Sequence, residues 1–152
     1  MIVHRLKATL PGHKGFFRVY EVKPDMKLYS FQKFLMNDLS FAPDQICLFK
    51  GVDQDGVVVS EYGLFDMGDG SMDTISFETL IRRGERRLLW FFDLFGERYL
   101  QFDFEDESEY VSRYSYPRLI SERGINPNQF SREYDDFEDI SISIGAEVEK
   151  EE

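Results

Sequence analysis

Two adjacent apolar runs separated by a single glycine constrain the fold more than any other feature of the chain. The runs are RRLLWFFDLF at 86–95 and ERYLQFDFE at 97–105, with Gly96 between them. The second run alternates apolar and polar residues, as a half-buried strand does, whereas the first is nearly all apolar, as a strand buried on both faces is. The pattern predicts a long central β-hairpin over 86–105, with a positive φ at Gly96 and with Asp93 accepting N–H bonds in the turn.

Before the hairpin, the chain predicts a strand–strand–helix–strand opening. Apolar side chains at spacings of three and four from Leu28 to Leu39 indicate one amphipathic helix, and β-branched and aromatic runs on either side of it indicate strands. After the hairpin, Pro117 and Gly124 bracket a segment for which we predict a short C-terminal helix. The opening elements are predicted as strands over 2–9, 16–22 and 46–51 and a helix over 28–39.

These elements predict a single α+β domain with a mainly antiparallel sheet over residues 1–139. Residues 140–152, ISISIGAEVEKEE, are interpreted as an acidic tail. Ile140, Ile142 and Ile144 alternate within this tail. That alternation is also the pattern of an edge strand, or of a tail that becomes a strand on binding a partner.

Charge and cysteine content limit the partners and the compartment. The chain holds 18 Lys and Arg against 29 Asp and Glu, a formal charge of −11, and residues 103–152 hold five against fifteen. A field of this sign repels nucleic acid and anionic membranes, so neither is an expected partner. No apolar run approaches the ~18 residues of a membrane span, and the N-terminus carries charge too early for a signal peptide. With Cys47 as its one cysteine, the chain is predicted to be cytoplasmic.

No residue pattern predicts a catalytic centre, a cofactor or a metal site. His4 and His13 are the two histidines, and no cysteine or carboxylate spacing completes a site around them. Cys47 lies between apolar residues with no base nearby, which is typical of an inert buried thiol. The turn at 53–56 lacks the acidic twelfth residue of a calcium loop, because Leu64 stands there.

Two other clusters of side chains allow a functional interpretation. Three tyrosines lie among acidic residues and are candidates for a partner surface, the alternative being a tyrosine layer over the sheet; they are Tyr110, Tyr114 and Tyr116. Four arginines form a basic cluster that we expect to pair with the acidic C-terminal third; they are Arg82, Arg83, Arg86 and Arg87.

The hairpin also carries a resemblance to a known family. LLWFFDLFGERYLQFDFE, together with YPRLISERGINPNQF at 116–130, resembles the Ri-plasmid ORF-three-like family, whose members include transposon passenger proteins. The hallmark hairpin is matched by Phe92, Asp93, Phe95 and Gly96, with Glu97 at the place of its second Asp and Tyr99 at the place of its Trp. The histidines that family members carry are replaced by other residues at 46–49 and at Gln101. The resemblance covers about residues 2–137; it implies an α+β domain with a mainly antiparallel sheet, and no activity.

The sequence therefore predicts a noncatalytic cytoplasmic interaction or accessory protein with a protein partner. The candidate functional or turn-stabilising residues are Asp93, Gly96, Glu97 and Tyr99. One alternative is an enzyme that uses the acidic loop 66–73, Asp93 and Glu97 to hold a divalent cation. A second alternative, taken from the family resemblance, is a nucleic-acid accessory factor of a mobile element.

Overall fold

The computed structural model describes residues 1–130, which form one seven-stranded sheet with two helices. The strands follow the order β4-β3-β5-β6-β1-β2-β7, and all six neighbouring pairs are antiparallel. The prediction of a mainly antiparallel α+β fold is therefore confirmed. The elements are β1 Ile2–Leu10, β2 His13–Val22, α1 Leu28–Asp38, β3 Leu48–Asp53, β4 Val58–Tyr62, α2 Phe77–Arg82, β5 Glu85–Asp93, β6 Arg98–Glu109 and β7 Arg118–Arg123.

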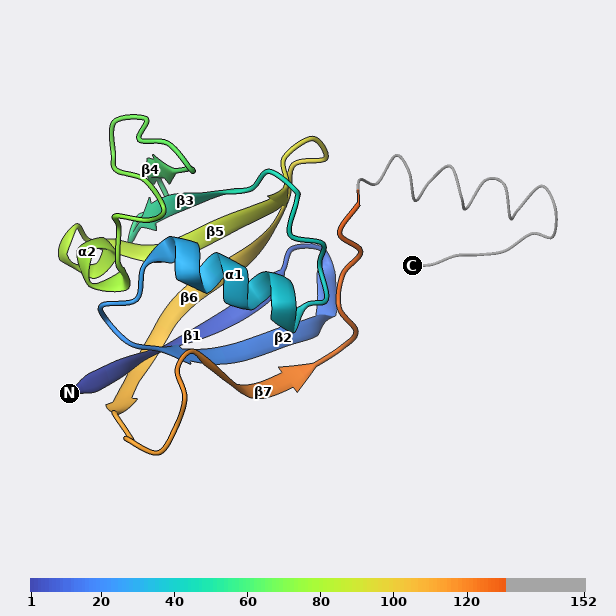
Figure 1. Cartoon of the computed structure of the whole chain (residues 1–152). Coiled ribbons are helices and arrows are strands. Elements are labelled where there is room, and N and C mark those ends of the chain that lie inside the picture. The colour runs from blue at the N-terminus through green and yellow to red at the C-terminus, as the bar shows by residue number, and fades with distance from the viewer. Residues whose placement is uncertain (131–152) are drawn as a thin grey trace, which may run out of the picture.

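Helix α1 lies across one face of the sheet and closes the core (Figure 1). Its apolar stripe is fully buried, including Leu28, Phe31 and Leu35. The Phe31 ring lies 5.3 Å from the ring of Phe102 on β6 and 6.1 Å from that of Tyr20 on β2. Edge-to-face ring contacts of this kind fix one arrangement of a large aromatic core.

The predicted hairpin is present as β5 and β6, and β5 lies inside the sheet between β3 and β6. Trp90 on β5 is fully buried, and its Nε1 donates a hydrogen bond to Gln32 Oε1 at 3.0 Å. Because the indole N–H has a partner, the whole side chain lies in the core without an unsatisfied donor.

The predicted C-terminal helix is wrong, because residues 118–123 form the edge strand β7 against β2. Arg18 on β2 is only 2% exposed, and its guanidinium donates to the main-chain oxygens of Arg123 at 2.8 Å and Gly124 at 2.9 Å. These bonds, with the ladder to β2, hold the segment extended, and no local sequence signal reports them. Strand β3 is also displaced along the chain, since it begins two residues later than predicted.

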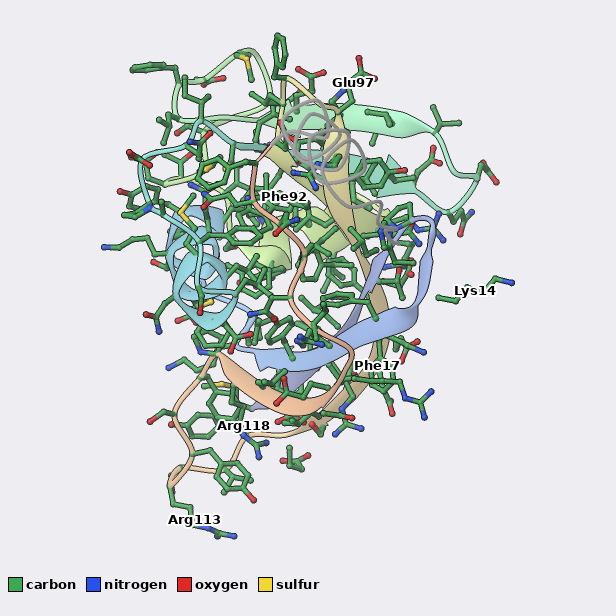
Figure 2. The ribbon with its side chains drawn as sticks, turned by 90° about the vertical axis from the view of Figure 1, so that its right-hand side faces the viewer. Lys14, Phe17, Phe92, Glu97, Arg113 and Arg118 are labelled. Carbon is green, nitrogen blue, oxygen red and sulfur yellow. The ribbon has the colours of Figure 1, made fainter. Side chains whose placement is uncertain are left out.

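The face of the sheet opposite α1 is uncovered by either helix, and Figure 2 shows Phe17 on that side. One row of cross-strand partners spans all seven strands there: Glu61, Lys50, Leu89, Gln101, Thr9, Phe17 and Arg123. We call this side the open face. On this face Lys7 Nζ lies 5.2 Å from the centre of the Phe17 ring and Lys50 Nζ lies 4.9 Å from the centre of the Phe91 ring, and the apolar Leu89 is buried.

A short segment after β7 ties the sheet to the end of α1. Asn126 Nδ2 donates to the main-chain oxygen of Leu39 at 3.1 Å, and the Gln129 amide forms two 2.7 Å hydrogen bonds with the backbone of Ala42. The predicted tail at 140–152 and the last residues of the predicted domain lie outside the described residues. Within residues 1–130, neither helix is long and apolar enough to cross a membrane.

Candidate functional site

Asp93 braces the turn of the β5–β6 hairpin. Its carboxylate accepts the Gly96 N–H at 2.9 Å and the Arg98 Nε–H at 2.8 Å, and it is buried. The expectation that Asp93 accepts a turn N–H is confirmed. The expected positive φ at Gly96 is wrong, because the left-handed residue of the turn is Glu97, with φ of 55°. Glycine is required at 96 for a different reason: a Cβ there would lie 2.6 Å from Asp93 Oδ2.

The other hairpin candidates point elsewhere. Glu97 is exposed at the tip of the hairpin (Figure 2), whereas Tyr99 lies on the open face with its ring 4.8 Å from that of Phe91. Asp93, Glu97 and Tyr99 therefore do not converge on one cleft. In this structure, the hallmark residues Asp93 and Gly96 stabilise a turn.

Replacing Asp93 by Ala is expected to lower the free energy of unfolding by about 2 kcal/mol, because Arg98 loses its carboxylate and the Gly96 N–H loses its acceptor. Urea unfolding measures the change. Glu97→Gly is the matched change in the same turn and is expected to raise stability by about 0.5–1 kcal/mol, because it removes a side chain from the left-handed region. Equal stability of Asp93→Ala and the wild type would contradict this structural role.

The carboxylates of the acidic loop 66–73 are bound within the loop and its neighbouring strand. Asp66 accepts the N–H groups of Gly68 and Gly70, which lowers the pKa of its carboxyl group. Asp69 accepts the N–H of Glu61 at 3.0 Å, and Asp73 accepts the hydroxyl of Ser71. Figure 1 shows this loop and the β5–β6 turn at separate corners of the molecule. Across residues 1–130, no three His, Cys, Asp or Glu side chains are grouped so that they could hold a metal ion.

Sequence reasoning missed a buried carboxyl group at the start of β5. Glu85 is 2% exposed, and the hydroxyl of Tyr62 lies 2.9 and 3.0 Å from its two carboxyl oxygens. Arg83 Nη1 donates to the same hydroxyl at 3.1 Å. The carboxyl group fits beneath β3 because a Cβ on Gly51 would lie 1.8 Å from Glu85 Oε1. A glycine inside a predicted strand is the signal that marks such a close approach.

Burial raises the pKa of Glu85 above that of an ordinary carboxyl group, with Tyr62 and Ser60 opposing the change. A raised folded-state pKa means that the associated stability is fully present below the unfolded-state pKa and is lost as pH rises through the folded-state value. Glu85→Gln is therefore expected to gain stability over the wild type between pH 4 and pH 7, by about 1.4 kcal/mol for each unit of difference in pKa. Urea midpoints at several pH values measure this, and a gap independent of pH would contradict it.

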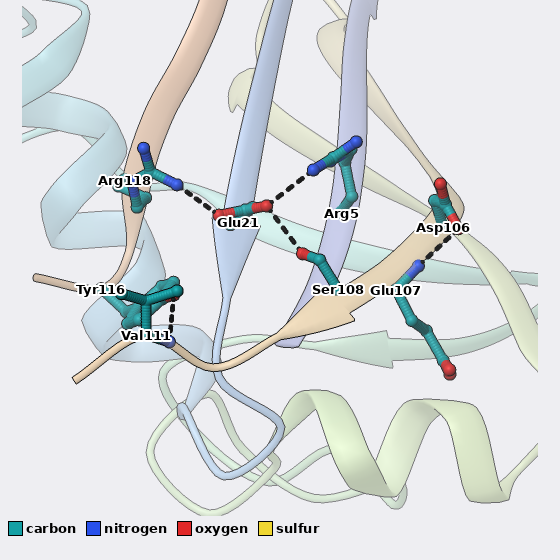
Figure 3. Close-up of polar contacts among 8 residues, drawn as sticks. All are labelled: Arg5, Glu21, Asp106, Glu107, Ser108, Val111, Tyr116 and Arg118. Carbon is teal, nitrogen blue, oxygen red and sulfur yellow. Dashed lines mark hydrogen bonds and ion pairs between the residues drawn. The ribbon is translucent and has the colours of Figure 1, made fainter. Parts of the chain in front are cut away.

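The three predicted tyrosines pack on one another in the connection between β6 and β7. The ring of Tyr116 lies 5.4 Å from that of Tyr110 and 6.4 Å from that of Tyr114, and the Arg118 guanidinium lies 3.9 Å from the Tyr114 ring centre. The Tyr116 hydroxyl accepts the N–H of Val111 (Figure 3). They do not form a layer over the sheet, since the connection lies beyond the end of β6 (Figure 1).

Beside these tyrosines, one buried carboxylate on β2 bonds to side chains of three other strands (Figure 3). Glu21 on β2 accepts from Arg5 on β1, Ser108 on β6 and Arg118 on β7. Burial alone would raise the pKa of Glu21, but these donors outweigh it and lower the pKa. All four side chains are thereby engaged in holding the strands together.

Sequence reasoning did not find the exposed apolar side chains on β4 and on the segments that precede and follow it. Phe65 is 81% exposed, and Val58 and Val59 are 47% and 48% exposed. We define the β4–loop surface as Val57, Val58, Val59, Leu64, Phe65 and Met67. Residues 51–81 contain seven Asp and Glu and no Lys or Arg, so the surface is apolar within an acidic stretch. The sequence signal that could have revealed this surface is a set of apolar residues within a turn-rich acidic segment.

Comparisons with known proteins support the fold alone. No family model matches the chain, and no curated protein matches it. A crystal structure of a protein of unknown function from Methanosarcina mazei Go1 is similar, with a TM-score of 0.72 and 14% sequence identity. The match covers 94% of this chain and 82% of that one. The resemblance to the Ri-plasmid ORF-three-like family remains a prediction carried by the hairpin residues.

Proposed function

We propose that this protein is a noncatalytic interaction protein and that the β4–loop surface is its docking site. The observation that carries the proposal is the exposure of six apolar side chains within residues 57–67, on β4 and the segments on either side of it, with Phe65 81% exposed. Exposed apolar side chains that cluster, rather than scatter singly, are characteristic of binding surfaces. Within residues 1–130, Asp93, Tyr99 and the three predicted tyrosines are instead engaged in intramolecular contacts.

The charge around the surface favours a basic partner. Arg87 pairs with Asp103 at 2.7 Å, and Arg83 donates to the main-chain oxygen of Asp69 and to the Tyr62 hydroxyl, whereas Arg82 and Arg86 are exposed. The segment 51–81, which carries the apolar side chains, itself holds seven carboxylates and no Lys or Arg. A segment that combines Lys or Arg with aliphatic residues matches both properties of the surface.

A titration with a blocked hexapeptide that alternates Lys and Val tests the proposal. We expect chemical-shift changes confined to β4 and to residues 63–67, weakening with salt, and no comparable changes with a peptide that alternates Glu and Val. Phe65→Ser combined with Met67→Ser is expected to abolish the changes, whereas Phe95→Ser, at an equally exposed site on the hairpin turn, leaves them intact. Equal binding of both peptides, or loss of binding in Phe95→Ser, would overturn the proposal.

Duplex DNA is not an expected partner. Two cations on the open face are paired with acids, Lys50 with Glu61 and Arg87 with Asp103. The formal charge of residues 1–130, with 16 Lys and Arg against 20 Asp and Glu, is −4. Fluorescence anisotropy at physiological salt is expected to show no binding tighter than the ~10⁻⁴–10⁻⁶ M of non-specific contacts. Submicromolar binding would instead support the mobile-element accessory role.

A further inference from the structure

We infer that the partner binds as an added strand along the outer edge of β4 and takes the place of the Asp69 carboxylate on the Glu61 N–H. This inference rests on the proposed function and specifies the form in which the partner binds. Strand addition uses main-chain hydrogen bonds for affinity and alternate side chains for specificity. It requires an edge whose main-chain groups are reachable, and β4 is the last strand on its side of the sheet.

One outward main-chain group of β4 and one just after its end are bound by the loop that follows the strand. The N–H of Glu61 donates to Asp69 Oδ2 at 3.0 Å, and the main-chain oxygen of Gly63 accepts from Met72 at 2.8 Å. Gly63 and Ser71 form an isolated parallel bridge. The loop thus occupies the outer edge with one side chain and one short bridge, where a neighbouring strand would form a continuous ladder.

Arg83 holds in place the loop segment that carries Asp69. Its Nη1 donates to the main-chain oxygen of Asp69 at 2.9 Å and to the Tyr62 hydroxyl at 3.1 Å. Edge strands in natural proteins are commonly blocked by charged side chains, which prevents pairing with unrelated chains. A carboxylate blocks the edge reversibly, because a main-chain oxygen from the partner can accept the same N–H.

A basic partner suits this exchange. When a partner oxygen accepts the Glu61 N–H in place of Asp69, the other carboxylates of residues 51–81 attract the Lys or Arg side chains of the incoming segment. Val58 and Val59 precede Glu61 on the same strand and remain about half exposed, so they offer apolar contacts along the added strand. The exchange replaces the Asp69 carboxylate by a partner oxygen as the acceptor of the Glu61 N–H.

Asp69→Ala tests the inference, with Asp55→Ala as the matched control. Both variants remove one negative charge from residues 51–81. Asp55, however, is exposed in the turn at 53–56, whereas Asp69 accepts the N–H of Glu61 on β4. We expect Asp69→Ala to bind the Lys–Val hexapeptide about tenfold more tightly than the wild type and Asp55→Ala to bind it more weakly. The Glu61 amide is expected to exchange faster in free Asp69→Ala and to become protected when the peptide binds.

The outcomes separate this inference from the proposed function. If both variants weaken binding equally, or if Phe65 responds to the peptide while the Glu61 amide gains no protection, the partner docks without adding a strand and only the inference fails. If neither the wild type nor Asp69→Ala binds the peptide, the proposed function fails with it. If Asp69→Ala instead dimerises in sedimentation, the Asp69 carboxylate prevents β4 from pairing with another copy of this chain. The assignment of the edge to a partner strand is then overturned.

Discussion

Replacing Trp90 by Ala is expected to lower the free energy of unfolding by about 3–5 kcal/mol, the usual cost of truncating a core aromatic side chain. Trp90 is fully buried, and its ring lies 5.8–6.4 Å from those of Phe41, Phe49 and Phe92. Truncation leaves a cavity among these rings and removes the partner of Gln32. Urea unfolding followed by circular dichroism measures the loss.

Trp90→Phe is the control for this prediction. It keeps most of the apolar volume and removes the donor to Gln32, so it is expected to cost less than the alanine substitution. The wild-type fluorescence of Trp90 is expected to be blue-shifted in the native state and to shift red on unfolding. A red-shifted native emission, or a Trp90→Ala variant as stable as the wild type, would show that β5 is not a core strand.

Replacing Gly51 by Ala is expected to cost about 3 kcal/mol. The new Cβ would lie 1.8 Å from Glu85 Oε1 and 2.4 Å from Ser60 Oγ. A flexible carboxylate on the surface would move aside at small cost. Glu85, however, is 2% exposed and bound to Tyr62 through both oxygens, so moving it leaves a buried polar group with poorer partners.

Two further variants isolate the cause. Gly15→Ala adds the same methyl group on β2 where no heavy atom lies within 4 Å, and it is expected to change stability by less than about 0.5 kcal/mol. Gly51→Ala combined with Glu85→Ala is expected to be more stable than the sum of the two single changes predicts, because the clash is absent. Additive effects in this cycle would contradict a steric conflict with Glu85.

The hairpin could be predicted from sequence because its causes are local. Alternation along 97–105, a turn glycine and a carboxylate three residues before it are all contained in one segment. Even there the reason for Gly96 was not predictable, because the approach of the Asp93 carboxylate depends on the folded turn. Burial of Trp90 followed from its place on the apolar arm.

The strand β7 and the functional surface depend on distant parts of the chain. Residues 118–123 are extended because β2 offers an edge and Arg18 requires main-chain acceptors, contacts that span 105 and 106 residues. The exposure of Phe65 is likewise a property of the assembled sheet, since a phenylalanine in a loop is equally compatible with a core position. For the candidate site, the sequence favoured the hairpin and the tyrosines. Asp93, Tyr99 and the three tyrosines make intramolecular contacts, whereas Glu97 is exposed.

The order of the strands also bears on how the chain reaches this structure during synthesis. β1 pairs with β6 in a register that joins Ile2 to Glu109. The hairpin of β1 and β2 therefore emerges from the ribosome long before β6 and β7, which flank it in the sheet. Until β6 and β7 are made, β1 and β2 form a two-stranded ribbon with two unpaired edges, a form that is at best marginally stable alone. Such non-local pairing is associated with slow folding and with exposure to aggregation. The nascent chain is therefore expected to acquire resistance to proteolysis in one late step, when β6 completes the middle of the sheet.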